Sequence, residues 1–321
     1  MTFTDLCTSL WTLSALRVAA ETDLLATLAD GPKDAKLAAI AAGLETEATS
    51  RILDVLVASG IVTRSGDRYA LEEEGRKLAA RGQGLRSDLA VTFGATRALY
   101  EEARRSDLAP GWRHVDPEVI RGQAGLSFEM THRIIGPITE AWPELAAHLA
   151  RDDARHLDVG VGGAGGAIAL CKHFPKLRIT GIDCLRAAYL EARTAVASAG
   201  LPNRIELRLQ RAEDMPDENV FHSAFVASKF FERSVLKSIL ANVRRALVPG
   251  GIAFLPGWRD PGDPKRRAVS RLREHLWGGS AVPGEEVVKI LEELGYVEIT
   301  QAPGQGDVLP IMAKTPSQYA R

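Results

Sequence analysis

A glycine-rich segment in the middle of the chain, Asp158–Gly166, constrains its fold more than any other feature. Its glycines follow the short predicted strand Leu157–Val159 and precede a helical pattern over Ala167–His173. Glycine tolerates positive φ and lets a ligand approach the backbone closely. The start of the next helix favours a negative group. A strand, a glycine turn and a helix in this order predict a nucleotide-binding unit of an α/β fold.

Strands and helices alternate from about residue 151 to residue 321. Further strands are expected at Leu177–Ile182, Ile205–Leu209, Ala224–Ala227, Gly251–Leu255, Val297–Thr300 and Val308–Ala313. Helices are expected between them, at Ala187–Ala199, Val235–Leu247 and Glu285–Leu294. This alternation predicts a Rossmann-like, doubly wound sheet of seven mostly parallel strands. The short gap between the last two strands predicts an antiparallel edge.

The region before this sheet has a different pattern. Residues 1–85 show helical spacing, including a helix near Glu47–Ser59, followed by a strand, turn and strand over residues 61–71. This order is the outline of a winged helix. Residues 86–150 are predicted to be helical, with interruptions at Pro110-Gly111-Trp112 and at Pro137. We therefore expect an N-terminal domain, a helical middle region and a C-terminal α/β domain.

Composition excludes several functional classes. The 321 residues carry a formal net charge of −1, which predicts no general attraction to nucleic acid or to anionic membranes. No apolar run approaches the roughly 20 residues that span a bilayer, and the first residues lack the pattern of a signal peptide. Cys7, Cys171 and Cys184 have neither metal-binding nor disulfide-like spacing. A cytoplasmic protein without a metal site is expected.

Two cofactors are compatible with the glycine segment. Gly160, Gly162 and Gly165 satisfy the spacing of a dinucleotide-binding loop, so an NAD-dependent dehydrogenase is one candidate. Asp183 ends the next strand, where a carboxylate can accept hydrogen bonds from ribose hydroxyls. Asp158 precedes the first glycine by two positions and can meet an ammonium group. With the mid-chain location and the segment 247–251, this pattern favours S-adenosylmethionine (SAM).

The chain resembles the small-molecule O-methyltransferases that have an N-terminal winged-helix dimerisation domain. Three segments match the family: Leu157–Gly165, His173–Arg178 with Gly181–Asp183, and Asn242–Gly251. The resemblance covers nearly the whole length because the helical N-terminal domain also fits. The resemblance implies a SAM-binding Rossmann-like domain and a homodimer formed through the N-terminal domains. It also implies an apolar acceptor pocket roofed by helices of the middle region.

Several positions depart from the family pattern or complete it. Ala164 stands where the family's third glycine usually lies, so either Gly165 takes over that bend or the loop is reshaped. Arg211 occupies the place of an aspartate that meets the adenine, and the neighbouring Glu213 or Asp214 is the expected substitute, with a solvated acidic turn as the alternative. Ser228 is assigned to the cofactor-binding residues.

The family's catalytic histidine is missing. Its place falls on Lys229, and Phe231 stands where the family has tryptophan. Lysine has an unperturbed pKa of about 10.4 and is a poor base unless burial lowers that pKa. One explanation is that another residue acts as the base, and His132, His222 and His275 are the candidates. His132 is the preferred one because it shares a helical face with residues 128, 131 and 135, although core packing explains that face slightly better.

Two further explanations need no base. An amine, an activated carbon or an enolate can attack the sulfonium methyl directly, with Lys229 paired to a carboxylate or enolate of the substrate. Alternatively the enzyme transfers no methyl group, and an amine of the cofactor attacks internally and releases methylthioadenosine. The acceptor, the attacked atom and the reaction itself therefore stay open at this point.

The remaining features decide less. Four tryptophans are candidates for an aromatic acceptor pocket or for core packing: Trp112, Trp142, Trp258 and Trp277. A DNA-binding regulator is disfavoured because the helix at Glu47–Ser59 has Arg51 as its single cation. The sequence therefore predicts a SAM-dependent methyltransferase that acts on a small molecule of specialised metabolism.

Overall fold

The computed structural model of the protein describes residues 2–105, 112–302 and 307–317. The chain divides into two compact units, Met1–Ala90 and Val91–Arg321. Helix α6 (Gln83–Glu102) crosses the division, so the boundary that we expected near residue 85 falls inside this helix. Residues 110 and 111 of the predicted interruption lie outside the described residues.

The first unit consists of helices and a small antiparallel sheet. Its helices are α1 (Phe3–Glu21), α2 (Leu24–Ala29), α3 (Ala35–Ala42), α4 (Thr46–Ala58) and α5 (Glu73–Arg81). Its strands are β1 (Lys33–Asp34), β2 (Val62–Ser65) and β3 (Arg68–Leu71), in the order β1-β3-β2. Leu24, Leu53, Leu56 and Tyr69 are fully buried in its core. Helices followed by a hairpin agree with the predicted outline, and a dimerising role stays a prediction.

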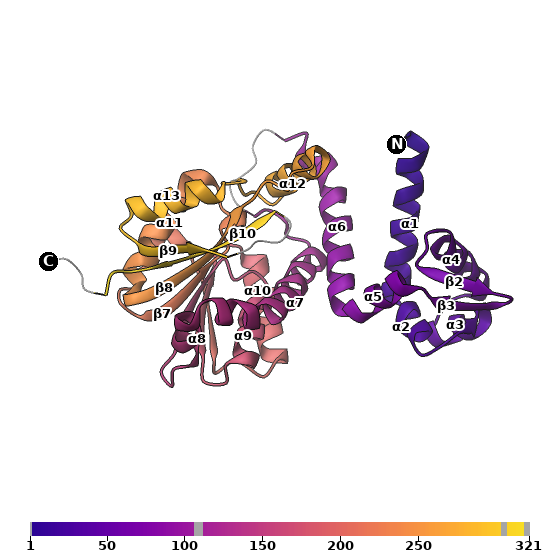
Figure 1. The fold of residues 1–321 in the computed structure, drawn as a ribbon, viewed down its shortest axis with the longest axis horizontal. Coiled ribbons are helices and arrows are strands. Elements are labelled where there is room, and N and C mark those ends of the chain that lie inside the picture. The colour runs from indigo at the N-terminus through magenta and orange to yellow at the C-terminus, as the bar shows by residue number, and fades with distance from the viewer. Residues whose placement is uncertain (1, 106–111, 303–306, 318–321) are drawn as a thin grey trace. The chain divides into compact units, whose positions relative to one another are not determined.

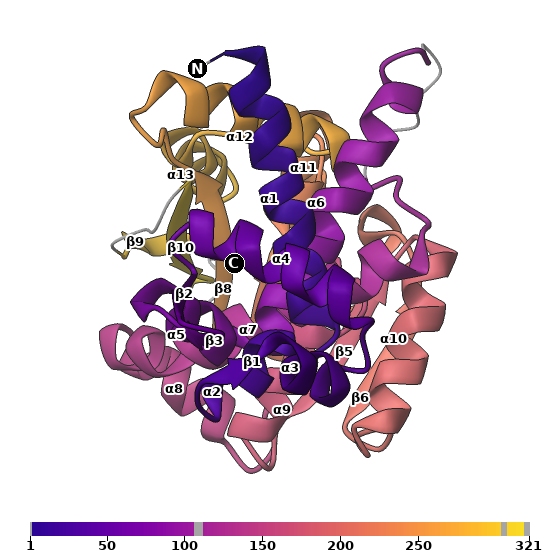
Figure 2. The same cartoon turned by 90° about the vertical axis from the view of Figure 1, so that its right-hand side faces the viewer.

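Helix α1 buries one half of its length and exposes the other. Thr2 begins it with a capping box, in which its hydroxyl accepts from Asp5 N–H and the Asp5 carboxylate accepts from Thr2 N–H. The buried residues lie in the second half, from Ala15 to Ala20. The first half extends beyond the other helices of this unit (Figures 1 and 2).

The second unit contains a seven-stranded sheet in the order β6-β5-β4-β7-β8-β10-β9. Its strands are β4 (Arg155–Val159), β5 (Arg178–Asp183), β6 (Ile205–Leu209), β7 (Phe221–Val226), β8 (Leu247–Trp258), β9 (Val297–Gln301) and β10 (Val308–Lys314). The pairs among β4 to β8 are parallel, whereas β10 pairs antiparallel with both β8 and β9. The predicted Rossmann-like sheet with an antiparallel edge is confirmed.

Helices cover both faces of this sheet (Figure 1). On one face lie α8 (Pro143–Ala150), α9 (Gly165–His173) and α10 (Arg186–Ser198), and on the other α11 (Arg233–Ala246) and α13 (Gly284–Glu293). Helix α7 (Pro117–Ala141) packs along α9, and α12 (Pro264–Leu276) follows β8. Pro137 lies inside α7 and does not interrupt it, contrary to expectation. Packing of Ile135 and Ile138 into the core holds the helix together across the missing N–H.

Two apolar clusters hold the sheet and its helices together. One joins Leu157 and Leu255 of the central strands to Leu236 and Leu240 of α11. The other packs Trp142 with α8, α9 and α10 on the opposite face. No helix within the described residues is both long and apolar enough to cross a membrane.

Candidate functional site

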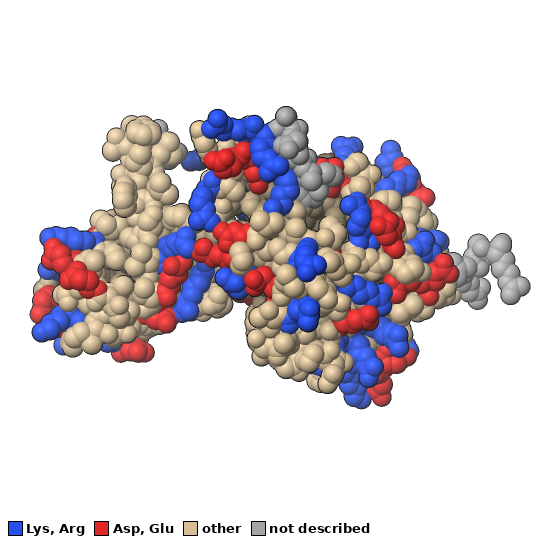
Figure 3. Space-filling model, turned by 180° about the vertical axis from the view of Figure 1, so that it is seen from behind, with Lys and Arg blue, Asp and Glu red and all other residues tan. Residues whose placement is uncertain are grey.

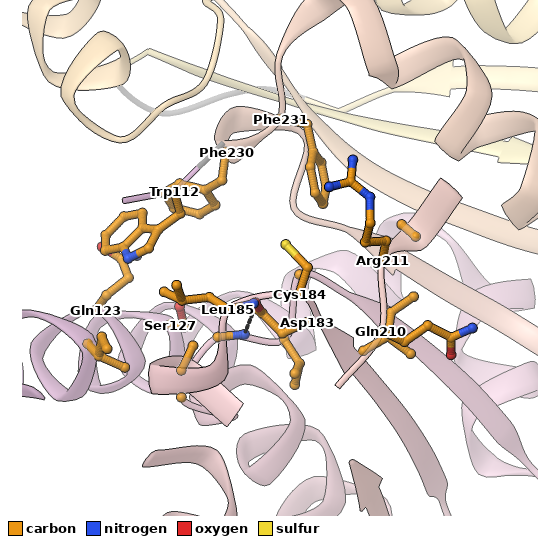
Figure 4. Close-up of a pocket in the computed structure, with 18 of the residues that line it drawn as sticks. Trp112, Gln123, Ser127, Asp183, Cys184, Leu185, Gln210, Arg211, Phe230 and Phe231 are labelled. Carbon is orange, nitrogen blue, oxygen red and sulfur yellow. Dashed lines mark hydrogen bonds between the residues drawn. The ribbon is translucent and has the colours of Figure 1, made fainter. Parts of the chain in front are cut away.

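A cavity of about 170 Å³ opens at the carboxyl ends of the parallel strands (Figure 4). The loops after β4, β5, β6 and β7 form its floor and sides, and α7 contributes one wall. Ligands of doubly wound sheets bind at this edge, because the loops that leave neighbouring strands meet there. The predicted glycine loop and Asp183 therefore come together in one site.

The glycine loop folds back on the end of β5. Gly160 and Gly162 have φ angles of +80° and +54°, which side chains other than glycine rarely adopt. A Cβ at Gly160 would lie 3.1 Å from the Cβ of Ala227. The N–H of Gly162 donates to Asp183 Oδ2 at 3.0 Å. Both glycines line the cavity, so the loop presents bare backbone to a ligand.

The third bend of the loop is made by Ala164 and not by Gly165. Ala164 has a φ of +64° and begins α9 in the left-handed conformation. Gly165 serves another purpose, because a Cβ there would lie 1.8 Å from the carbonyl oxygen of Ala124 in α7. The glycine at this position thus allows α7 and α9 to pack closely.

Asp183 is held in place by backbone groups. Its Oδ1 accepts a hydrogen bond from Leu185 N–H at 2.8 Å, in addition to the bond from Gly162. Burial raises the pKa of Asp183, and these N–H donors act against that shift. A carboxylate offers about four lone-pair positions. Asp183 lines the cavity, and these backbone donors orient its carboxylate there.

Asp158 lies beneath the loop, within β4. Its side chain is 5% exposed and does not line the cavity. Burial, followed by the nearby charge of Asp183, raises the pKa of Asp158 to about 7. This carboxyl therefore holds its proton more tightly than a solvent-exposed aspartate does.

The loop after β6 closes the far end of the cavity. Arg211 Nη2 lies 2.5 Å from Glu213 Oε1, and both residues line the cavity (Figure 4). Asp214 does not line it, so of the two predicted adenine contacts only Glu213 is placed to make one. Cys184 projects into the same end beside Phe231.

Lys229 and Ser228 lie outside the cavity lining. The Nζ of Lys229 is 3.4 Å from Glu274 Oε1 and 3.3 Å from Asp307 Oδ1, and the side chain is 12% exposed. The Ser228 hydroxyl donates to the carbonyl of Pro256. Both polar groups already have partners within the protein, and the chemical roles suggested by sequence for these two residues stay predictions.

The candidate histidines also lie away from the cavity. His132 is exposed and stacks on Phe128, with 6.2 Å between ring centroids. The N–H of Arg155 donates to His222 Nδ1 at 3.1 Å, at the amino end of the strands. His275 does not line the cavity either. His132 was expected at the acceptor site but lies outside it, because another face of α7 lines the cavity.

The face of α7 that does line the cavity was not recognised from the sequence. It consists of Ile120, Gln123, Ala124 and Ser127, which have the i, i+3, i+4, i+7 spacing of one helical face. Glu232, at the start of α11, was also missed. The helical spacing was visible in the sequence, but nothing in it distinguished this face from the neighbouring one.

Aromatic rings form the side of the cavity opposite Asp183. Trp112, Phe230 and Phe231 line it, and Trp277 packs behind them, 6.2 Å from Trp112 and 5.4 Å from Phe230 between centroids. The other two tryptophans are structural. Trp142 packs on Phe254 in the core, and Trp258 Nε1 donates to Ser270 Oγ.

Comparison with known proteins agrees with this geometry. Residues 157–251 match the sequence model of a family described as a methyltransferase domain. A 3-hydroxy-5-methyl-1-naphthoate 3-O-methyltransferase of Streptomyces sahachiroi is 28% identical over 274 residues, which are 78% of this chain and 75% of the relative.

Solved structures show the same fold. Mitomycin 7-O-methyltransferase superposes with a TM-score of 0.68 at 20% identity, covering 97% of this chain and 96% of the other. An O-methyltransferase of neocarzinostatin biosynthesis, solved with SAM and 2-hydroxy-5-methyl naphthoic acid, has a TM-score of 0.59 at 20% identity, covering 95% and 96%. The glycine loop and Asp183 both lie within the residues that match the methyltransferase domain model.

Proposed function

We propose that this protein, a SAM-dependent methyltransferase, transfers the methyl group to a hydroxyl of a small aromatic molecule. The observation that carries the proposal is the cavity itself, which joins a cofactor loop to an aromatic wall. Asp183 and the backbone of Gly160 and Gly162 form one side, and Trp112 and Phe230 form the other.

The cofactor end fits SAM in three respects. The bare backbone of the glycine loop accommodates the amino acid part of the cofactor, with Asp158 beneath it to balance an ammonium charge. The carboxylate of Asp183 suits the ribose hydroxyls, and Glu213 suits an adenine amino group; both residues line the cavity. When bound, SAM supplies an electrophilic methyl group on a sulfonium.

The acceptor end suits a planar ring. Aromatic side chains bind aromatic ligands by stacked or edge-on contacts and by burial of apolar area. The relative from Streptomyces sahachiroi acts on a hydroxylated naphthoate, and the α7 face adds the polar groups of Gln123 and Ser127. These features support a hydroxylated aromatic acceptor of specialised metabolism.

Methyl-labelled SAM tests the proposal. The protein is incubated with the cofactor and a panel of planar phenols that includes 3-hydroxy-5-methyl-1-naphthoate, and products are separated by mass. Labelled methyl ether and S-adenosylhomocysteine in equal amounts are expected. Binding of SAM without methylation of any acceptor would contradict the proposal.

Internal cyclisation of SAM is the second candidate function. It is favoured by one observation: Lys229, at the usual place of the base, faces Glu274 and Asp307 and not the cavity. The same incubation separates the two reactions, because cyclisation releases methylthioadenosine and needs no acceptor. An NAD-dependent dehydrogenase would show NAD binding in calorimetry, and none is expected.

The protein is further proposed to act as a homodimer in the cytoplasm. The free half of α1 supports the dimer, since Phe3, Leu6, Leu10 and Trp11 are 79%, 51%, 58% and 74% exposed. Figure 3 shows this part of α1 with scarcely any charged side chain on the visible face. A contiguous apolar surface of this kind is typical of a protein interface. Neither nucleic acid nor a membrane is an expected partner.

A further inference from the structure

We infer that His114 is the catalytic base, and that its Nε2 takes the proton from the acceptor's hydroxyl. The inference rests on the proposed methyl transfer to oxygen. It supplies the group that Lys229 does not provide. His114 was not among the histidines that the sequence singled out.

The hydrogen bonds of His114 prepare one ring nitrogen for this role. The side chain is 6% exposed and its ring bonds to the backbone of Leu276. Its Nε2 is buried and has no hydrogen-bond partner among the described residues. The bond to Leu276 therefore belongs to Nδ1, which must donate its proton to the carbonyl. Nε2 is left with a lone pair, as a base requires.

The neighbours of His114 connect it to the cavity wall. Trp112 Nε1 donates to the carbonyl of His114 at 2.9 Å, and the two rings meet edge-on at 5.1 Å between centroids. Trp112 lines the cavity and also contacts Phe230 and Trp277. Arg113, paired with Glu102 at 2.9 Å, donates to the carbonyl of His275 at 2.9 Å and fixes this segment against the end of α12.

A second unpartnered polar atom lies in the same group of rings. Trp277 is 8% exposed, and its Nε1 is buried without a partner among the described residues. A buried donor or acceptor that stays unpaired costs about 1–3 kcal/mol, so two in one cluster call for an explanation. A hydroxyl is both donor and acceptor. It is therefore the chemical group that satisfies an empty acceptor such as Nε2 and an empty donor such as Trp277 Nε1.

Electrostatics favours the neutral ring. Burial lowers the pKa of His114 and is the largest effect on it. The charge of Arg113 acts in the same direction, while the carboxylates of Glu102 and Asp116 and the Leu276 carbonyl act against it. The ring is thus neutral at pH 7 and able to accept a proton.

The acceptor must displace Trp112 to reach Nε2. His114 does not itself line the cavity, so the hydroxyl reaches it when the Trp112 side chain moves aside. Catalytic hydrogen bonds are commonly incomplete before substrate binds. In the reaction the hydroxyl proton passes to Nε2 while the oxygen forms its bond to the methyl carbon. The carbon–sulfur bond breaks, its electron pair stays on sulfur, and His114 afterwards releases the proton to water.

Kinetics of His114→Gln test the inference. With SAM and 3-hydroxy-5-methyl-1-naphthoate as probe, we expect kcat to fall by about 10²–10⁴-fold, while the Kd of SAM in calorimetry stays within twofold. His173→Gln is the matched control, because His173 is exposed on α9 and outside the cavity lining. The native kcat should rise with pH and level off below pH 7, and the variant should lose this dependence.

A second measurement does not depend on turnover. In native protein with ¹⁵N-labelled histidine, NMR should show His114 as the neutral Nδ1–H form at pH 7. An Nε2–H form or an imidazolium would overturn the inference, as would a His114→Gln variant that keeps kcat within threefold of native. A native protein that binds SAM but methylates no phenol overturns the proposed function as well, which distinguishes the two failures.

Discussion

At the scale of single residues, the cofactor loop divides its small residues between two tasks. Gly160 and Gly162 provide positive φ beside the cavity, whereas Gly165 provides space for α7. Ala164 adopts the left-handed conformation despite its Cβ, which costs roughly 1–2 kcal/mol relative to a residue without one. The loop therefore stores some strain where the family has glycine.

Substitutions at 164 and 165 should differ in their effect on stability. Gly165→Ala forces a Cβ against the carbonyl of Ala124, and overpacking of this kind costs about 1–3 kcal/mol. We expect a lower Tm and weaker SAM binding. Ala164→Gly removes the backbone strain of the folded state, which raises stability. Glycine also increases the conformational entropy of the unfolded chain, which lowers stability, so the Tm should stay within a few degrees of native. Thermal unfolding and calorimetry measure both, and equal Tm losses in the two variants would contradict this division.

Asp158 should lose a proton when SAM binds. Its pKa is raised to about 7 by burial and by Asp183, and an ammonium group nearby favours the charged carboxylate. SAM affinity should therefore increase from pH 6 to pH 8, by up to tenfold per pH unit below the pKa. Calorimetry in buffers with different ionisation enthalpies counts the proton. A pH-independent Kd without proton release would show that Asp158 does not meet the cofactor's charge.

The same residue predicts how stability varies with pH. The folded pKa of about 7 lies above the usual value of 3.8, so the native state holds the proton more tightly than the unfolded chain. The resulting stability is complete below about pH 4 and is lost as the pH rises through 7. Asp158→Asn should therefore raise the Tm of the ligand-free protein at pH 8 and leave it nearly unchanged at pH 4.

At the scale of elements, Lys229 joins three parts of the second unit. It belongs to the short helix η2 (Ser228–Phe230), Glu274 belongs to α12, and Asp307 directly precedes β10. Asp307 also accepts from Ser270 at 2.5 Å and pairs with Arg273 at 2.7 Å. This network holds the turn whose next residues, Phe230 and Phe231, line the cavity. The position of Lys229 thus indicates a positioning role.

Lys229→Met should be strongly destabilising. It leaves the 1% exposed carboxyl of Glu274 without its cation, and breaking a buried pair costs about 3–5 kcal/mol. The double variant Lys229→Met/Glu274→Met should recover most of that loss. Lys237→Met is the control, because Lys237 pairs with Glu293 on the surface, at 55% and 44% exposure, and such pairs contribute about 0–1 kcal/mol. Urea unfolding measures all three, and similar losses at 229 and 237 would contradict a buried network.

At the scale of the whole molecule, the free half of α1 predicts self-association. The double substitution Leu10→Asp and Trp11→Asp places charge on the free half of α1 and leaves the buried half of the helix unchanged. Native protein should sediment as a dimer and the variant as a monomer with unchanged secondary structure. Lys36→Asp serves as a charge control on α3, outside the free half of α1. A native protein that sediments as a monomer at micromolar concentration would refute the proposed dimer.

Local patterns were enough to predict most of the fold. The apolar strands at 157–159 and 177–182 alternate with helices, and this regularity led to the sheet and its antiparallel edge. Pro137 misled the prediction, because the loss of one helical hydrogen bond is offset by core contacts that no local pattern contains.

The sequence by itself determined the nucleotide loop, its partner Asp183 and the α/β class, because spacing along neighbouring strands and turns encodes them directly. Tertiary structure alone decided which side chains surround the acceptor. In the folded protein Lys229 pairs with Glu274 and Asp307. The face of α7 that carries Gln123 lines the cavity, and the face that carries His132 does not. His114 is buried against Trp112. Burial and partners arise from segments far apart in the chain, and these set whether a polar group is a base, a structural tie or a solvated residue.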